Sequence, residues 1–217
     1  MALEGTADWH WWRNHLEGDQ LEPVGVDGLA QVIVTGLDAR WIGIPFRDLS
    51  VAIAARRLSR PEEQGYYFAR AFNASRFFAG VERWWFHTPY LYRRDLHMEV
   101  GDAPAISLGS RPTLDVLAKP GPGRPSGGPD PTQEMGYNGP LFLPRGDDRA
   151  RRRWLMVRTH GLTSTFHFDA ACDRFELGTE CPDNILAGLR ASHFQGVRWH
   201  LRRNATHARS KTFKARR

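Results

Sequence analysis

The sequence predicts a mainly β protein with a few short helices, folded as a single domain of 217 residues. Many short segments are rich in β-branched and aromatic residues or alternate apolar with polar residues, which is typical of strands. Glycine and proline separate these segments at short intervals, and few segments show the helical spacing of apolar residues. Many strands with few helices predict a barrel or a sandwich.

The N-terminal half is expected to begin with a short helix and to continue with strands. Asp8 can cap a helix over residues 8–17, which brings three apolar residues to one face: Trp9, Trp12 and Leu16. Strands are expected where β-branched and aromatic residues alternate with polar ones, at residues 31–37, 50–58 and 65–73.

A second helix is expected between Ser75 and Pro89. Asn73 or Ser75 can cap its N-terminus, and Pro89 ends it because proline restricts Thr88 to extended geometry. Four apolar residues fall at helical spacing on one side of this helix: Phe77, Val81, Trp84 and Trp85.

The C-terminal half is expected to alternate strands with one long loop and one short helix. Residues 119–131 hold so many proline and glycine residues that no regular element is expected, so residues 119–150 are interpreted as a flexible, partly basic insertion. A helix is expected at 183–190, and residues 203–217 are interpreted as a basic tail. Strands are expected at residues 90–100, 104–108, 112–118, 153–159, 163–169, 173–178 and 195–203.

The composition excludes several classes of protein. A hydrophobic content of 41% with eight Trp and twelve Phe indicates a packed core, not a disordered chain. No run approaches the roughly 18 apolar residues of a membrane span, and no cleavable signal pattern opens the chain, so no membrane partner is expected. The two cysteines make neither a disulfide framework nor a zinc site, and the histidines lack metal-ligand spacing. We therefore expect a cytoplasmic protein with no metal and no cofactor.

The formal charge of +6 raises the alternative of a nucleic-acid partner. The positive residues gather near Arg151 and in the tail, and the tail is the better candidate for contact with a polyanion. An arginine-rich, solvated surface explains the same pattern and is favoured, because the aromatic strand motif and the zinc-finger spacing of RNA- and DNA-binding domains are both missing.

The segment from Gly65 to Val100 carries the most specific signal. Arg83 stands six residues before Pro89, and Tyr90 follows the proline. This spacing resembles the signature of the acetoacetate decarboxylase-like superfamily, and in particular its DUF2071-like branch. The resemblance implies a closed antiparallel β-barrel with an internal cavity that binds a small organic ligand in its lumen, and it leaves assembly into a homo-oligomer open.

The residue after Pro89 departs from the decarboxylases, in which a lysine at this position forms a Schiff base with the substrate. The chain has only three lysines, and none lies in an apolar strand that could desolvate its amine: Lys119, Lys211 and Lys214. Because an amine nucleophile must be neutral near pH 7, the sequence argues against imine chemistry from a buried lysine.

Three residues of this segment are candidate catalytic groups. Tyr90 would direct a phenol to the place of the missing amine, where it can donate a hydrogen bond to a carbonyl oxygen or act as a general acid. Arg83 matches the arginine of the family motif, and His87 could exchange protons at neutral pH. The alternative is that Tyr90 fills the barrel, Arg83 forms an ion pair and His87 packs.

Candidate substrate-binding residues come from strand 65–73 and the following helix. Strict alternation places Tyr66, Phe68 and Arg70 on one face, where the guanidinium could hold a carboxylate. An internal salt bridge of Arg70 or an outward orientation is the alternative. Trp85 is the fourth candidate, from the helix.

These residues predict a small-molecule-binding barrel that acts on a carbonyl or carboxylate compound as a lyase, isomerase or hydratase without an imine. A carrier or sensor with the same barrel and no turnover is the first alternative. A nucleic-acid-associated protein is the second.

Overall fold

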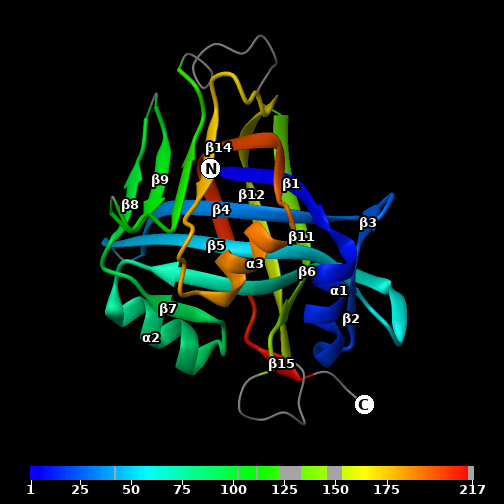
Figure 1. The fold of residues 1–217 in the computed structure, drawn as a ribbon. Coiled ribbons are helices and arrows are strands. Elements are labelled where there is room, and N and C mark those ends of the chain that lie inside the picture. The colour runs from blue at the N-terminus through cyan, green and yellow to red at the C-terminus, as the bar shows by residue number, and fades with distance from the viewer. Residues whose placement is uncertain (42, 102, 111, 123–132, 146–152, 215–217) are drawn as a thin grey trace.

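A computed structural model of the chain describes residues 1–217 except 42, 102, 111, 123–132, 146–152 and 215–217. Seven long strands form a closed ring in which each strand is hydrogen-bonded to two neighbours (Figure 1). Around the ring these strands are β5 (Ile44–Arg57), β4 (Leu29–Trp41), β1 (Ala2–Asp8), β14 (Gln195–Arg209), β12 (Arg153–His167), β11 (Gln133–Leu143) and β6 (Arg60–Asn73). Every pairing in the ring is antiparallel except that of β11 with β6, which is parallel.

Shorter elements extend the ring and cover its outside. The strands β2 (Leu21–Pro23), β3 (Gly25–Val26), β7 (Tyr90–Tyr92) and β15 (Phe213–Lys214) pair with β5, β4, β6 and β12 in that order. A separate four-stranded sheet contains β8 (Leu96–Glu99), β9 (Ala105–Leu108), β10 (Val116–Lys119) and β13 (Arg174–Leu177). The helices are α1 (Trp9–Leu16), the 3₁₀ helix Glu17–Asp19, α2 (Arg76–Trp85) and α3 (Asn184–Ala191).

The capping residues explain where the three α-helices begin. Asp8 accepts a hydrogen bond from the Trp11 amide at 2.6 Å at the start of α1, and the Ser75 side chain accepts one from the Phe78 amide at the start of α2. Asp183 accepts from the amides of Ile185 and Leu186 at the start of α3. The helices predicted from the sequence are therefore confirmed.

The register divides the ring into two faces, because residues opposite each other in a strand pair lie on the same face. On β5 the outer face includes Leu49, Val51 and Ile53, which belong to the large core that also buries Trp12 and Trp199. The inner face of the ring carries a smaller apolar cluster, formed by Ala52, Phe68, Ala71, Tyr90, Leu143, Leu155 and Val157.

Several parts of the chain differ from the expected elements: the short strands β2, β3 and β15 were not expected, and the expected strand 90–100 is divided into β7 and β8. Residues 133–143 of the expected insertion form β11, and residues 203–209 of the expected tail continue β14. The strand β1 was not expected at all. The ring closes where β6 pairs with β11 in parallel. Gly65 permits the close approach of these two strands, because a Cβ atom at this position would lie 2.1 Å from the Pro140 carbonyl oxygen.

Candidate functional site

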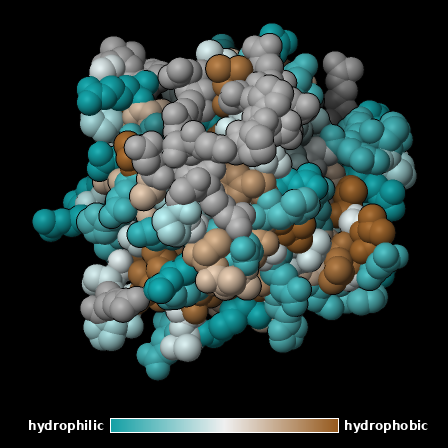
Figure 2. Space-filling model, turned by 90° about the horizontal axis from the view of Figure 1, so that it is seen from above, coloured by the Kyte–Doolittle hydropathy of each residue, from teal (hydrophilic) through white to brown (hydrophobic). Residues whose placement is uncertain are grey.

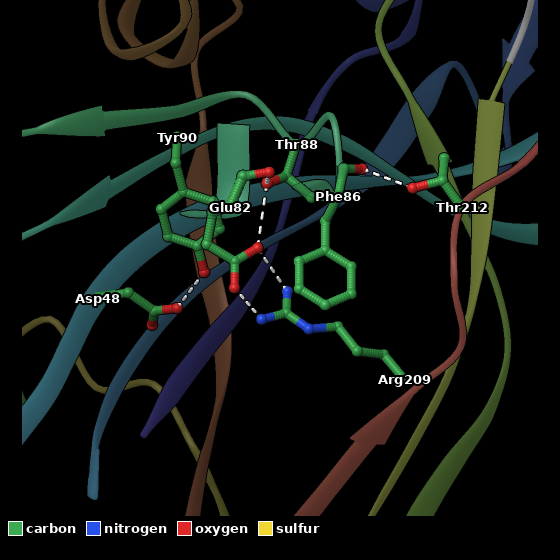
Figure 3. A network of polar contacts seen from close by, with 7 residues as sticks. All are labelled: Asp48, Glu82, Phe86, Thr88, Tyr90, Arg209 and Thr212. Atoms are coloured by element: carbon green, nitrogen blue, oxygen red, sulfur yellow. Dashed lines mark hydrogen bonds and ion pairs between the residues drawn. The ribbon is translucent and has the colours of Figure 1, made fainter. Parts of the chain in front are cut away.

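Tyr90 lies on the inner face of the ring, where its hydroxyl contacts Asp48 and a separate ion pair of Glu82 with Arg209 lies nearby (Figure 3). It is the first residue of β7, its side chain is buried, and its hydroxyl donates a short hydrogen bond to the carboxylate of Asp48 on β5. The rings of Phe46 and Phe68 pack beside the phenol, with centroid separations of 6.4 and 5.8 Å. The phenol therefore packs against aromatic rings, whereas the carboxylate of Asp48 also interacts with the positive charges of Arg209 and of the N-terminal amino group.

Burial controls the protonation of both members of this pair. It raises the pKa of Asp48 to about 6, although the hydrogen bond from Tyr90 opposes the shift. Burial also raises the pKa of Tyr90 well above its usual value, and the neighbouring Asp48 adds to the effect. Tyr90 thus stays protonated, whereas Asp48 can gain or lose its proton near neutral pH.

A second pair joins α2 to the C-terminal end of β14. The guanidinium of Arg209 donates to both carboxylate oxygens of Glu82, at 2.7 Å to Oε2 and through a shorter contact to Oε1 (Figure 3). The Thr88 hydroxyl donates to Glu82 Oε2 at 3.1 Å, and the Phe86 ring lies 4.5 Å from the guanidinium carbon. The Glu82 side chain is only 3% exposed, so its charge depends on Arg209 for compensation.

Arg202 is a further charged group on the inner face. It lies two residues beyond His200 on β14, opposite Thr163, and therefore shares the face of His200. Its Nε and Nη1 donate to the hydroxyls of Thr163 and Thr159, both at 2.9 Å. Within the described residues no carboxylate pairs with it, since Glu4 is engaged by His200 and Gln31. Burial lowers the pKa of Arg202. A half-buried guanidinium that, among the described residues, is held only by hydroxyls is suited to bind an anionic group.

Asn73 adds a neutral donor to this face. It is fully buried and lies opposite Asp48 in the β5–β6 register. Its Oδ1 accepts from the Ser75 amide, whereas its Nδ2 has no hydrogen-bond partner among the described residues. A buried donor without a partner is costly, so Nδ2 is suited to donate to a ligand oxygen.

The sequence-predicted residues of β6 divide between the two faces. Tyr66 and Phe68 lie on the inner face as expected, but Arg70 lies on the outer face. The cause is a register irregularity between Val51 and Ala52, which changes the alternation along β6. Arg70 pairs with Asp183 at 2.9 Å and lines a hollow of about 430 Å³ outside the ring. Strict alternation was therefore the wrong assumption for Arg70.

The predicted residues of α2 and its C-terminal turn do not meet Tyr90. Arg83 and Trp85 are exposed, because the helix directs Glu82 inward and the next residue points about 100° away. His87 is also exposed and adopts a left-handed conformation, with φ of 54°. Desolvation and the nearby charges of Arg153 and Lys214 lower its pKa. The structure brings Tyr90, Tyr66 and Phe68 to one face and leaves the other four residues elsewhere.

Asp48, Glu82, Arg202 and Arg209 form the polar part of the site, and the sequence analysis named none of them as a functional residue. Asp48 had a weak signal, since it is an acidic residue at the start of the mostly apolar run 49–55. Arg202 belonged to the expected strand 195–203, and Arg209 was hidden in the expected basic tail. All three lysines are exposed and lie outside this network: Lys119, Lys211 and Lys214.

Comparison with solved structures relates the whole chain to one fold. An acetoacetate decarboxylase-like enzyme from Sphingomonas wittichii RW1 superposes with a TM-score of 0.58 at 11% identity, covering 99% of this chain and 89% of that one. Acetoacetate decarboxylase from Legionella pneumophila gives 0.57 at 9% identity, with 99% and 84% covered. The enduracididine biosynthesis enzyme MppR, complexed with the condensation product of pyruvate and imidazole 4-carboxaldehyde, gives 0.52 at 12% identity, with 98% and 82% covered.

These similarities show that the chain has the acetoacetate decarboxylase-like fold, which confirms the predicted fold class. No family model matches the chain and no curated protein matches it, so membership of the DUF2071-like branch stays a prediction. Among the described helices, none is long and apolar enough to cross a membrane.

Proposed function

We propose that the inner face of the ring binds a small organic molecule bearing a carbonyl and a carboxylate group, and that Asp48 and Tyr90 exchange protons with it. The observation that carries this proposal is the buried hydrogen bond between Tyr90 and Asp48, on the inner face of an acetoacetate decarboxylase-like ring. Polar pairs with shifted pKa values are typical of functional sites.

The Tyr90–Asp48 pair would act as a proton relay. With a pKa of about 6, Asp48 is available in both forms near neutral pH. When protonated, it donates to the Tyr90 oxygen, and the Tyr90 proton then points to a ligand carbonyl. When ionised, it can accept a proton released by the ligand. Polarising a carbonyl and stabilising its enolate in this way serves an isomerase, a hydratase or a lyase that forms no imine.

Arg202 would hold the carboxylate of the ligand. Thr159 and Thr163 hold its guanidinium, and no carboxylate of the described residues neutralises it, which leaves its charge for an anion. Asn73 Nδ2 supplies a further donor on the same face. The exposure of all three lysines supports a mechanism without a Schiff base.

Exchange of the pyruvate methyl protons in D2O, followed by NMR, tests this function. We expect the wild-type protein to accelerate exchange and Tyr90→Phe to lose at least about 100-fold of the rate, since a positioned acid contributes roughly that much. Tyr92→Phe, at a half-exposed tyrosine of the same strand, is the matched control and should exchange as fast as the wild type. Full activity of Tyr90→Phe, or a lysine adduct trapped by borohydride with pyruvate, would contradict the proposal.

A carrier or sensor with the same inner face is the second candidate. The observation that favours it is the hydrogen bond from Tyr90 to Asp48. While Asp48 is ionised, the Tyr90 hydroxyl donates its one hydrogen bond to Asp48, so it cannot donate to a ligand. Binding of pyruvate with no exchange of its methyl protons, at pH values below as well as above 6, would assign the protein to this class.

A further inference from the structure

The outward side of α2 exposes large aromatic side chains. Trp84 and Trp85 are 81% and 70% exposed, and Phe77 is exposed about two turns before them. The segment that carries Phe213 lies beside the end of this helix, because the Thr212 hydroxyl donates to the Phe86 carbonyl at 2.9 Å (Figure 3), and the Phe213 ring packs on Trp154 with 43% of the residue exposed. We call Phe77, Trp84, Trp85 and Phe213 the aromatic face. It exposes on the order of 500 Å² of side chain, which is at the upper end for a monomer.

The orientation of this helix is fixed from its inward side. Phe78, Ala79 and Glu82 are buried against the ring, and Arg209 holds Glu82 with two hydrogen bonds. Turning the helix to cover its tryptophans would expose Phe78 and break the Glu82 pair. The tryptophans are therefore presented to the outside as a consequence of the fold.

Positive charges surround the aromatic face. Arg76 and Arg83 are exposed on α2, and Lys211 and Lys214 are exposed on the segment that carries Phe213. Residues 76–86 and 210–214 contain one acidic residue, Glu82, which is buried and paired. Seen from above, away from α2 and β15, hydrophilic and hydrophobic residues are interspersed (Figure 2).

We propose that the aromatic face binds the surface of an anionic lipid membrane. Tryptophan side chains favour the boundary between water and lipid, and neighbouring cations add attraction to acidic headgroups. A convex helix needs no complementary groove to enter such a surface. A second copy of the chain fits less well, because a symmetric pair would oppose the two sets of cations. The aromatic area also falls short of the about 800 Å² that each partner buries in a stable dimer.

Co-sedimentation with vesicles of phosphatidylcholine, with and without phosphatidylglycerol, tests the proposal. We expect the wild-type protein to bind the phosphatidylglycerol vesicles at low salt, and Trp84→Ser/Trp85→Ser to lose at least about tenfold in affinity. Val26→Ser/Val100→Ser is the matched control, because it removes exposed apolar residues elsewhere, and it should bind like the wild type. Arg83→Ser should lose about fivefold, as expected for one cation at an acidic surface.

Tryptophan fluorescence supplies a second measurement. Addition of phosphatidylglycerol vesicles should shift the emission of the wild type to shorter wavelength, and Trp84→Phe/Trp85→Phe should keep binding but lose the shift. The proposal is overturned if the wild type does not sediment with these vesicles, or if the serine variant binds equally well. A concentration-dependent dimer that the serine variant abolishes would also overturn it, in favour of a second copy.

Discussion

Arg209→Met should lower the free energy of unfolding by about 3–5 kcal/mol, the range expected when one partner of a buried ion pair is removed. Glu82 is buried, and its two carboxylate oxygens accept from Arg209. Without the guanidinium, the carboxylate must remain uncompensated or take up a proton. The same pair links α2 to the end of β14, so its loss also weakens the attachment of that helix to the ring.

Chemical denaturation of two further variants distinguishes the loss of a buried ion pair from the loss of any arginine ion pair. Arg56→Met breaks a pair with Glu22 that is more exposed than the Glu82 pair, at 42% and 19% of the two side chains, and should cost at most about 1 kcal/mol. Glu82→Leu/Arg209→Met removes both charges and should recover most of the lost stability. If Arg209→Met were as stable as Arg56→Met, burial of the Glu82–Arg209 pair would add nothing to the free energy of unfolding, and the prediction would be wrong.

Asp48→Asn should gain stability relative to the wild type as the pH rises from 4 to 7, by about 3 kcal/mol. Folding raises the pKa of Asp48 from 3.8 to about 6 because burial disfavours its charged form. Below pH 4 the carboxyl is protonated in the folded and the unfolded states. Between these pKa values the unfolded state releases the proton first, so the unfolding free energy of the wild type falls until the pH exceeds about 6.

The difference between the two unfolding free energies, measured across this pH range, checks the prediction. Asparagine keeps an oxygen that can accept from Tyr90, so the variant isolates the titration from the hydrogen bond. Tyr90→Phe removes the hydrogen bond that opposes the shift and should move the change to higher pH. Parallel pH curves for the wild type and Asp48→Asn would contradict a buried, titrating carboxyl.

Local signals predicted the framework of this fold. Asp8, Ser75 and Asp183 start their helices through side-chain hydrogen bonds that depend only on neighbouring residues. The strands rich in β-branched and aromatic residues were found for the same reason. By contrast, β1 and β11 contain several polar or glycine residues, and their strand conformation depends on partners far along the chain.

The site was harder to predict because it depends on register. A single register shift in the β5–β6 pair, beside Val51, directs Arg70 outward and Ala71 inward. No feature of the sequence of residues 65–73 predicts this shift. The family spacing drew attention to Arg83, whereas the helix presents Glu82 to the ring. The family spacing singled out Tyr90 as the residue after Pro89, but the partner of its hydroxyl, Asp48, is 42 residues away in sequence.

Pyruvate binding by isothermal titration, compared between Arg202→Met and Arg83→Met, tests most directly whether the inner face of the ring is a ligand site. Both variants remove one guanidinium, but only Arg202 lies on the inner face, whereas Arg83 is exposed on α2. We predict that Arg202→Met weakens binding at least about tenfold, as for a lost charge-assisted hydrogen bond, and that Arg83→Met binds like the wild type. Equal affinities of the two variants, or no binding of pyruvate by the wild type, would contradict the proposed site.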